Sequence, residues 1–216
     1  ALLAQKSLLL ISDESMLTIS HMGVTEGFLG MISSPKARSE ALKYMEEKNI
    51  SALNKLISEY PESGDALEKL RSLLLLSGSN DEIIKKLREM GADKKSLDEL
   101  EEVVSVLDSD ALRIDFSVLG GMNYYNGITF RGYVKGVPES VISGGQYDKL
   151  MARMGKKAKA IGFAVYMDAL EKLLEGRDEF NLDVALVYDD ETSMSEVLRK
   201  AEEIRKSGRS VSTMKK

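Results

Sequence analysis

The sequence changes its pattern in residues 112–134, which read LRIDFSVLGGMNYYNGITFRGYV. Residues 112–118 and 128–134 alternate or run apolar with β-branched and aromatic side chains, and such runs are typical of β-strands. Gly120-Gly121 and Asn126-Gly127 stand between the two runs, and these dipeptides favour turns. The stretch therefore predicts β-structure in the middle of the chain.

Further strands are expected on both sides of this stretch. Upstream, residues 16–20 alternate like a short strand. Downstream, residues 141–143 predict a third strand that Gly144-Gly145 would stop, and residues 161–175 begin apolar and continue as a helix. We expect the strands within residues 112–175 to form one antiparallel sheet, with that helix packed across it.

Residues 35–108, by contrast, have a helical period almost throughout. Ser79 with Glu82, and Ser96 with Glu99, match the Ser-x-x-Glu capping box that begins many helices. Gly91 stands where a C-terminal cap is expected. The apolar positions recur every three or four residues on two faces, at Ile83, Ile84, Leu87 and Met90 and at Leu97, Leu100, Val103, Val104 and Leu107. The segment predicts a separate lobe of short antiparallel helices.

The end of the chain predicts a different arrangement. Residues 182–188 have the pattern of a strand, and a helix follows for which Ser193 and Glu196 suggest another capping box. A further strand begins near Ser210. The order strand, helix, strand is typical of the opening of an α/β domain.

Composition excludes several classes of function. Hydrophobic residues make up 43% and the formal net charge is −5, which does not suggest the basic face of a nucleic-acid-binding protein, although local basic patches stay possible. The chain has no cysteine and one histidine, His21, so zinc-thiolate sites and thiol catalysis are excluded, and we expect no metal and no cofactor. No acid or nucleophile stands beside His21, which predicts a structural role. No apolar run approaches the ~20 residues of a membrane span.

Three segments, in this order, resemble histidyl-tRNA synthetases and their catalytically silent relatives. Residues 120–130, GGMNYYNGITF, are similar to the family's Arg-Gly-Leu-Asp-Tyr-Tyr turn and the Thr-x-Phe that follows it. Residues 143–150, SGGQYDKL, are similar to Gly-Gly-Arg-Tyr-Asp-x-Leu. Residues 161–170, IGFAVYMDAL, are similar to class II motif 3, Gly-Phe-Ala-x-Gly-x-Glu-Arg-Leu. Together the three segments carry the resemblance over essentially the whole chain.

The resemblance implies an α+β fold of the class II aminoacyl-tRNA synthetase type, with an antiparallel sheet. Residues 1–34 and 109–178 would form the core, and residues 35–108 a helical insert. Residues 179–216 would begin an anticodon-binding-like α/β domain. The opening Ala1-Leu2-Leu3-Ala4 lacks an initiator Met, and we expect the chain to be a C-terminal fragment whose relatives carry motifs 1 and 2 upstream.

Four positions depart from the family's pattern. Gly120 stands where the family has Arg, Asn123 where it has Asp, Tyr166 where it has Gly, and Ala169 where motif 3 has Arg. Forming an aminoacyl adenylate places charge on the α-phosphate, and losing one positioned cation there costs ~3 kcal/mol or more. We therefore expect no catalytic residues and no synthetase activity.

The resemblance also implies residues for histidine recognition, namely Tyr124, Tyr125, Tyr147 and Gly145. Tyr124 and Tyr125 are neighbours on an expected strand, so their side chains would face opposite ways and only one would line a pocket. Packing in the core is the ordinary role of an aromatic strand residue. Tyr147 has a comparable alternative, as an aromatic that anchors a Gly-Gly turn.

Residues 130–133, FRGY, and 136–140, GVPES, extend the resemblance to the regulatory subunits of ATP phosphoribosyltransferase. That resemblance implies a non-catalytic protein of histidine biosynthesis in the cytoplasm. Its partners would be the short catalytic subunit, L-histidine and, in the full-length protein, further copies of itself, but neither a membrane nor a nucleic acid. Two alternatives stay open, a fragment of a true histidyl-tRNA synthetase and a histidine-sensing or protein-interaction module.

Overall fold

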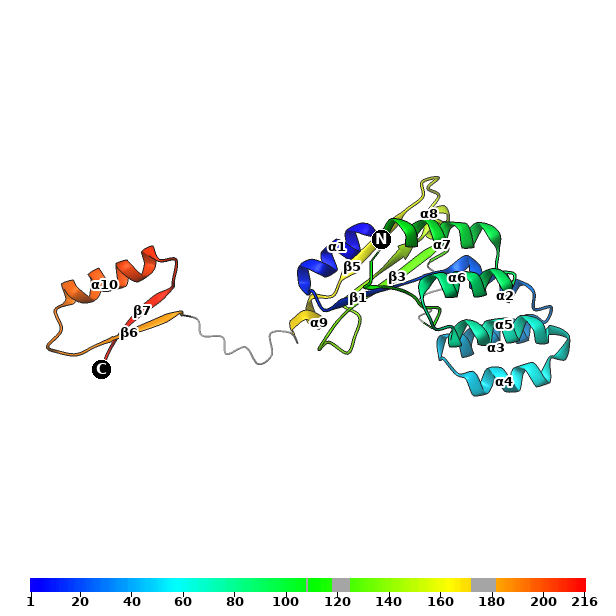
Figure 1. The fold of residues 1–216 in the computed structure, drawn as a ribbon, viewed down its shortest axis with the longest axis horizontal. Helices are drawn as coiled ribbons and strands as arrows, with labels where there is room; N and C mark the ends of the chain where they lie inside the picture. Colours follow the sequence, from blue (N-terminus) through cyan, green and yellow to red (C-terminus); the bar gives the residue numbers. More distant parts are fainter. Residues whose placement is uncertain (108, 118–124, 172–181) are drawn as a thin grey trace. The chain divides into compact units, whose positions relative to one another are not determined.

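The computed structural model describes residues 1–107, 109–117, 125–171 and 182–216. The chain divides into two compact units, Ala1–Leu173 and Leu174–Lys216. The larger unit combines a five-stranded sheet with helices, and the smaller one is a strand, a helix and a strand (Figure 1). Within the described ranges, none of the helices combines the length and the apolar character that crossing a bilayer requires.

The larger unit alternates strands and helices at both ends and is helical in the middle. It begins with α1 (Leu2–Ile11), β1 (Ser15–His21) and α2 (Met22–Gly30). The helical stretch contains α3 (Pro35–Glu46), α4 (Ile50–Glu59), η1 (Pro61–Ser63), α5 (Gly64–Leu75), α6 (Asn80–Glu89) and α7 (Lys94–Leu107). The chain then forms β2 (Leu112–Ile114), β3 (Ile128–Val134), β4 (Ile142–Gln146), α8 (Asp148–Arg153), β5 (Ile161–Val165) and α9 (Met167–Glu171).

The sheet has the strand order β2-β1-β3-β4-β5. The pairs β1–β3, β3–β4 and β4–β5 are antiparallel, which confirms the predicted antiparallel character. β1 and β2 are parallel instead. This exception has a topological cause, because β2 follows β1 after a long crossover through the helices, and such crossovers return the chain in the same direction.

Three strand predictions need correction. β2 has three residues, not the seven expected in 112–118. Gly144-Gly145 was expected to end a strand but lies inside β4. Residues 161–165 form β5, and the helix that was expected from residue 161 begins at Met167. A short apolar run does not distinguish a strand from a helix by its period alone, which explains the last error.

The helix caps also differ in part from the sequence pattern. The Ser79–Glu82 capping box forms in both directions, and Gly91 has the positive φ of a C-terminal cap, +75°. The Ser96–Glu99 box is wrong, because Asp93 accepts hydrogen bonds from both the backbone N–H and the Oγ of Ser96 at the start of α7. Ser193 precedes α10 without a capping bond, and its hydroxyl pairs with Ser195.

One face of the sheet is apolar and covered by helices. Leu8 of α1 packs against Gly132 of β3, where a Cβ would stand 3.0 Å from the Leu8 Cδ1 atom. On the same face the rings of Phe130 and Phe163 lie 6.3 Å apart, on either side of Gly144. The apolar core continues from this face into α2–α7. The helices thus hold the sheet from one side.

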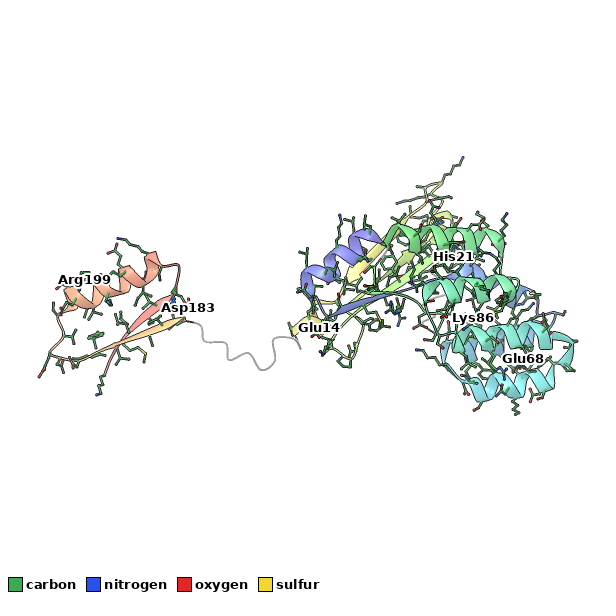
Figure 2. All side chains as sticks on the ribbon, viewed as in Figure 1. Glu14, His21, Glu68, Lys86, Asp183 and Arg199 are labelled. Atoms are coloured by element: carbon green, nitrogen blue, oxygen red, sulfur yellow. The ribbon has the colours of Figure 1, made fainter. Side chains whose placement is uncertain are left out.

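The smaller unit consists of β6 (Val184–Tyr188), α10 (Met194–Lys206) and β7 (Val211–Lys215). β6 and β7 pair in parallel, as the strand–helix–strand pattern predicts. Asp183 fixes the start of the pair, because its carboxylate accepts from the Ser210 N–H at 2.6 Å and from the Ser210 Oγ at 2.8 Å (Figure 2). The domain boundaries at residues 34, 108 and 178 stay predictions.

Candidate ligand-binding face

The other face of the sheet carries small and polar side chains. Directly opposite residues of antiparallel strands share a face, so the register defines rows across β1, β3, β4 and β5. One row contains Ser20, Thr129, Gly145 and Gly162, and the next contains Thr18, Arg131, Ser143 and Ala164. The Ser20 and Thr129 hydroxyls are buried and lie 2.9 Å apart. We call this surface the polar face.

Two tyrosine rings lie on the polar face, where glycines leave room for them. A Cβ at Gly145 would stand 2.7 Å from Cδ1 of Tyr125, and a Cβ at Gly162 would stand 3.0 Å from the Tyr147 hydroxyl oxygen. Gly145 and Gly162 are paired, so both rings lie over the same part of the sheet. Tyr125 precedes β3, which corrects the expectation that it belongs to a strand.

Hydrogen bonds fix the segments that carry the two rings. Asn126 donates its N–H to the Gln146 carbonyl at 3.0 Å, and its Oδ1 accepts from the Lys149 N–H at 3.1 Å. Tyr147 donates its N–H to the Ala160 carbonyl at 2.9 Å. The backbones of Tyr125 and Tyr147 are therefore held by the ends of β4 and β5 and by the start of α8.

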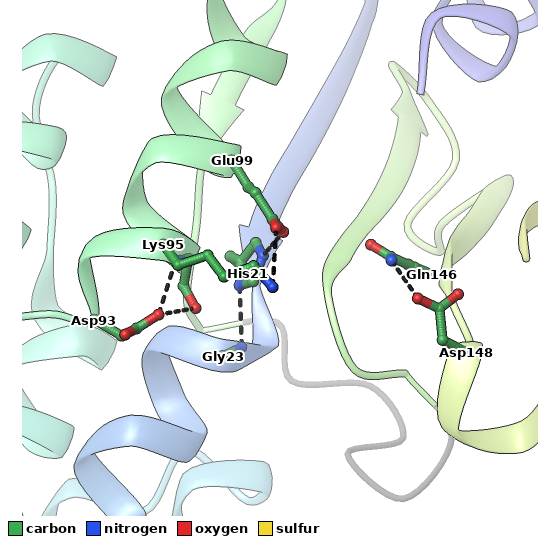
Figure 3. A network of polar contacts seen from close by, with 8 residues as sticks. His21, Gly23, Asp93, Lys95, Glu99, Gln146 and Asp148 are labelled. Carbon is green, nitrogen blue, oxygen red and sulfur yellow. Dashed lines mark hydrogen bonds and ion pairs between the residues drawn. The ribbon is translucent and has the colours of Figure 1, made fainter. Parts of the chain in front are cut away.

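Asp148 completes this support. Its carboxylate accepts from Gln146 Nε2 at 2.6 Å and from the Ala160 N–H at 2.9 Å (Figure 3). Burial acts to raise the pKa of Asp148, but these hydrogen bonds and the charge of Lys159 outweigh it, so the pKa lies below its ordinary value. Asp148 is thus an ionised anchor that joins the two strand ends.

A pocket of about 500 Å³ lies farther along the polar face. The Tyr166 hydroxyl and the Ser143 hydroxyl are hydrogen-bonded across it at 2.6 Å. Ala169, one of the positions where the family pattern has Arg, is buried in its wall. The pocket is lined by Arg131, Tyr133, Pro138, Glu139, Ser140, Ser143, Tyr166, Asp168 and Ala169.

The structure groups the predicted site residues in two places. Tyr125, Gly145 and Tyr147 lie together over the glycine pair, and Tyr166 and Ala169 line the pocket. Tyr124, Gly120 and Asn123 lie outside the described residues. These groupings give the candidate residues a common face, while their roles in binding stay predictions.

Arg131 and Ser143 are pocket residues that stand inside the FRGY and SGGQYDKL segments, although the resemblance assigns neither of them a role. The signal was present in the alternation of residues 128–134, where Thr129, Arg131 and Tyr133 are the odd-numbered positions and thus share one face. It was not decisive, because a polar face of a strand is usually solvent-exposed and without function.

His21 lies on the apolar face, away from the tyrosines, and has a structural role. Its Nδ1 accepts from the Gly23 N–H at 3.1 Å, which caps α2 and places the ring proton on Nε2. Nε2 then donates to Glu99 Oε2 of α7 at 3.0 Å (Figure 3). The acidic partner stands 78 positions away in the chain, so no residue near His21 in the sequence indicates it.

Comparison with known proteins gives a consistent result. The model of the histidyl-tRNA synthetase family matches residues 2–170. The ATP phosphoribosyltransferase regulatory subunit of Geobacter sulfurreducens is 31% identical over 88% of this chain and 46% of its own length. The chain spans about half the length of the curated relatives it matches.

Two solved structures are similar in fold. An ATP phosphoribosyltransferase regulatory subunit/histidyl-tRNA synthetase from Bacillus halodurans has a TM-score of 0.74 at 24% identity, over 99% of this chain and 58% of its own. The ATP phosphoribosyl transferase (HisG:HisZ) complex of Thermotoga maritima has a TM-score of 0.60 at 16% identity, over 76% of this chain and 58% of that one. At these identities the likeness concerns the fold alone.

Proposed function

The chain belongs to the histidyl-tRNA synthetase family, and on that premise we propose that it is part of an ATP phosphoribosyltransferase regulatory subunit. Such a subunit would catalyse nothing itself. It would activate the short catalytic subunit of histidine biosynthesis and take part in feedback by histidine. We place the protein in the cytoplasm, with residues 35–108 as a helical insert and residues 179–216 as the start of an anticodon-binding-like domain.

The pocket around Tyr166 and Ala169 carries the proposal against synthetase activity. Adenylate chemistry needs a fixed cation beside the developing phosphate charge. Ala169 offers a buried methyl group where motif 3 supplies a guanidinium. The Tyr166 ring, bonded to Ser143, occupies the wall where the motif has a bare backbone. A pocket built in this way can bind a polar ligand, but its one guanidinium comes from Arg131 of β3, and the motif 3 position itself carries no cation.

The curated relatives support the regulatory assignment. The relatives from Geobacter sulfurreducens, Clostridium kluyveri and Moorella thermoacetica, at 30–32% identity, are named regulatory subunits of ATP phosphoribosyltransferase. The Thermotoga maritima structure has the same fold within a complex of that transferase. On this basis we propose the short catalytic subunit as the partner, with self-association of the full-length protein.

We propose the two tyrosines as the surviving part of a histidine site. A phenol can satisfy one imidazole nitrogen, and the bare backbone at Gly145 and Gly162 accommodates the Tyr125 and Tyr147 rings over the same part of the sheet. A neutral hydrogen bond contributes only about 1 kcal/mol net, so tight binding needs charged partners for the amino and carboxylate groups. We expect binding by this chain alone to be weak.

The test adds the complete protein that contains this chain to a short catalytic subunit from the same source. We expect the rate of ATP phosphoribosyl transfer to rise with the added protein and to fall when histidine is present. ATP–pyrophosphate exchange with histidine should remain at the no-enzyme background. Exchange without any effect on transfer would instead establish the synthetase alternative.

A further inference from the structure

Two opposite charges line one pocket on the polar face without pairing with each other. Arg131 of β3 and Asp168 of α9 both contribute to the wall of the pocket of about 500 Å³. Among the described residues, neither the guanidinium nor the Asp168 carboxylate forms an ion pair or a side-chain hydrogen bond. Separated charges of opposite sign in one pocket fit a ligand that carries both signs.

The register places Arg131 close to the tyrosines. Arg131 pairs with Ser143 and Ser143 with Ala164, so the three residues share one row on the polar face. The next row contains Gly162, over which the Tyr147 hydroxyl lies. Neighbouring rows on one face are two residues apart along the strand, or about 7 Å. A small ligand can therefore reach from the tyrosine hydroxyl to the row of the guanidinium.

The strands that form the floor between the two rows carry small side chains. Along β4 the face changes from Gly145 to Ser143, and along β5 it changes from Gly162 to Ala164. Tyr166 closes the far end, because its hydroxyl is hydrogen-bonded to the Ser143 hydroxyl at 2.6 Å. A ligand can lie along β4 and β5 from the tyrosines to the charged pocket, and Tyr166 limits its length.

We propose that the amino-acid end of histidine binds in this pocket, with its α-carboxylate on the Arg131 guanidinium and its α-ammonium on the Asp168 carboxylate. The imidazole would lie at the tyrosine hydroxyls. Three single bonds of roughly 1.5 Å each separate the ring from the carboxylate carbon, so one histidine spans the distance between the two rows. The choice of ligand rests on the proposed function, and the new element is a pair of charged partners within this chain.

The charges of the pocket favour a zwitterion over a phosphate. Asp168 and Glu139 line the pocket together with Arg131, so two carboxylates stand beside one guanidinium. A phosphate ester carries a charge of about −1.5 to −2 and would be repelled by both carboxylates. A zwitterion is neutral and sets each of its charges against an opposite one. Ala169 supplies no cation, and among the residues that line the pocket the guanidinium comes from a different strand.

Solvent keeps the binding modest. Arg131 is half-buried and Asp168 is exposed, so water screens both interactions. One hydrogen bond between charged groups then changes the affinity by about tenfold. Histidine binding by this chain alone thus stays weak, whereas the discrimination between histidine and analogues that lack one charge is set by the pocket.

The test compares three ligands on the 216-residue chain by NMR titration at a pH of about 8, where a free imidazole is neutral. L-Histidinol has a hydroxymethyl group in place of the carboxylate, and imidazole lactate has a hydroxyl in place of the ammonium. We expect histidine to bind about tenfold more tightly than either analogue. Arg131→Gln should reduce the preference over histidinol to less than about twofold, and Asp168→Asn should do the same to the preference over imidazole lactate.

Two further variants separate the charge from effects on folding. Arg131→Lys keeps the positive charge and should restore part of the preference over histidinol. Arg153→Gln changes an exposed arginine of α8 outside the pocket and should bind all three ligands as the unaltered chain does.

Three results would refute the proposal. They are equal binding of histidine and histidinol by the unaltered chain, no binding of histidine at any concentration, and a preference that persists in Arg131→Gln. Inorganic phosphate that binds more tightly than histidine and displaces it would refute the proposal in favour of an anion site. These titrations contain no catalytic subunit, so they can fail while the activation assay succeeds, and the reverse also holds.

Discussion

At the residue scale, the polar face depends on glycines that leave room for aromatic rings. A methyl group at Gly145 would meet both the Tyr125 ring and the Ile128 carbonyl, at 2.7 and 2.8 Å. We predict that Gly145→Ala lowers the free energy of unfolding by about 1–3 kcal/mol and weakens any histidine binding. Urea unfolding and calorimetric titration measure the two effects.

Gly64→Ala is the control for this change, because nothing lies within 4 Å of its Cβ position and its φ of −56° suits alanine. It should be neutral or slightly stabilising. Equal losses of stability in both variants would show that Tyr125 does not need the bare backbone at Gly145.

Tyr166 allows a second prediction at this scale. Tyr166→Gly removes the ring that bonds Ser143 and restores the family's residue, so the pocket becomes larger. We predict that ATP–pyrophosphate exchange stays at background, because Ala169 still supplies no cation. Exchange that rises above background in this variant would show that the ring, rather than the missing charge, blocks the chemistry.

At the element scale, the Asn80 side chain hydrogen-bonds to the outer backbone groups of β2, in the place that a neighbouring strand would take. Asn80→Ala leaves the Ile114 N–H without its partner, while the Leu112 carbonyl keeps the bond from Arg113 Nη1 at 2.8 Å, and we predict a loss of about 1–3 kcal/mol in the free energy of unfolding. Asn54→Ala removes a bond to Arg71 on an exposed helix surface and should change stability by less than about 0.5 kcal/mol. Chemical denaturation of both variants decides whether the edge closure matters.

The Asp93 cap at the start of α7 predicts that the stability of the fold depends on pH. Hydrogen bonds from the Ser96 backbone and hydroxyl hold the pKa of Asp93 below its ordinary value. The unfolded chain therefore takes up a proton at higher pH than the folded one, and this stabilisation is present above the ordinary carboxyl pKa and lost as pH falls below it. Asp93→Asn keeps a capping oxygen, so its stability should fall less between pH 5 and 2 than that of the unaltered chain.

The exposed Asp98→Asn substitution on the same helix is the control for Asp93→Asn. Thermal unfolding measured across this pH range should give it the profile of the unaltered chain. An identical profile for Asp93→Asn would mean that the cap carries no proton linkage.

Helices and strands were predicted from the sequence more reliably than the contacts between them. The periods of residues 83–107 and 128–134 placed helices and a strand correctly, because local periodicity reports which face is buried. Gly144-Gly145 was read as a stop because local propensity disfavours glycine in strands, whereas both residues lie where a Cβ would meet a distant segment, β5 at Gly144 and the Tyr125 ring at Gly145. Asp93 was missed although its bonds to Ser96 are local, because Ser96 was paired with Glu99 instead, and Arg131 was missed because its pocket is assembled from residues far apart in the sequence.

At the scale of the whole molecule, the two units differ in the size of their cores. The smaller unit buries three apolar side chains, Val197, Ala201 and Val211, among the residues described in it. So small a core supports little independent stability. We predict that amides of α10 exchange far faster than those of α5, whose Leu67 and Leu70 are fully buried. Equal protection of the two helices would show that the smaller unit is stabilised by contacts beyond its own core.

The unequal edges of the sheet limit how the molecule can polymerise. A fibre that grows by strand pairing needs two reactive edges on every subunit, one to join the growing end and one to receive the next subunit. Asn80 occupies the outward groups of β2, so among the described residues the five-stranded sheet has one free edge, at β5. Two copies that paired through β5 would form a dimer, and assembly through this sheet would stop there. The amide of Asn80 thus blocks fibre growth at one edge, and its loss would give the sheet the second free edge that fibre growth requires.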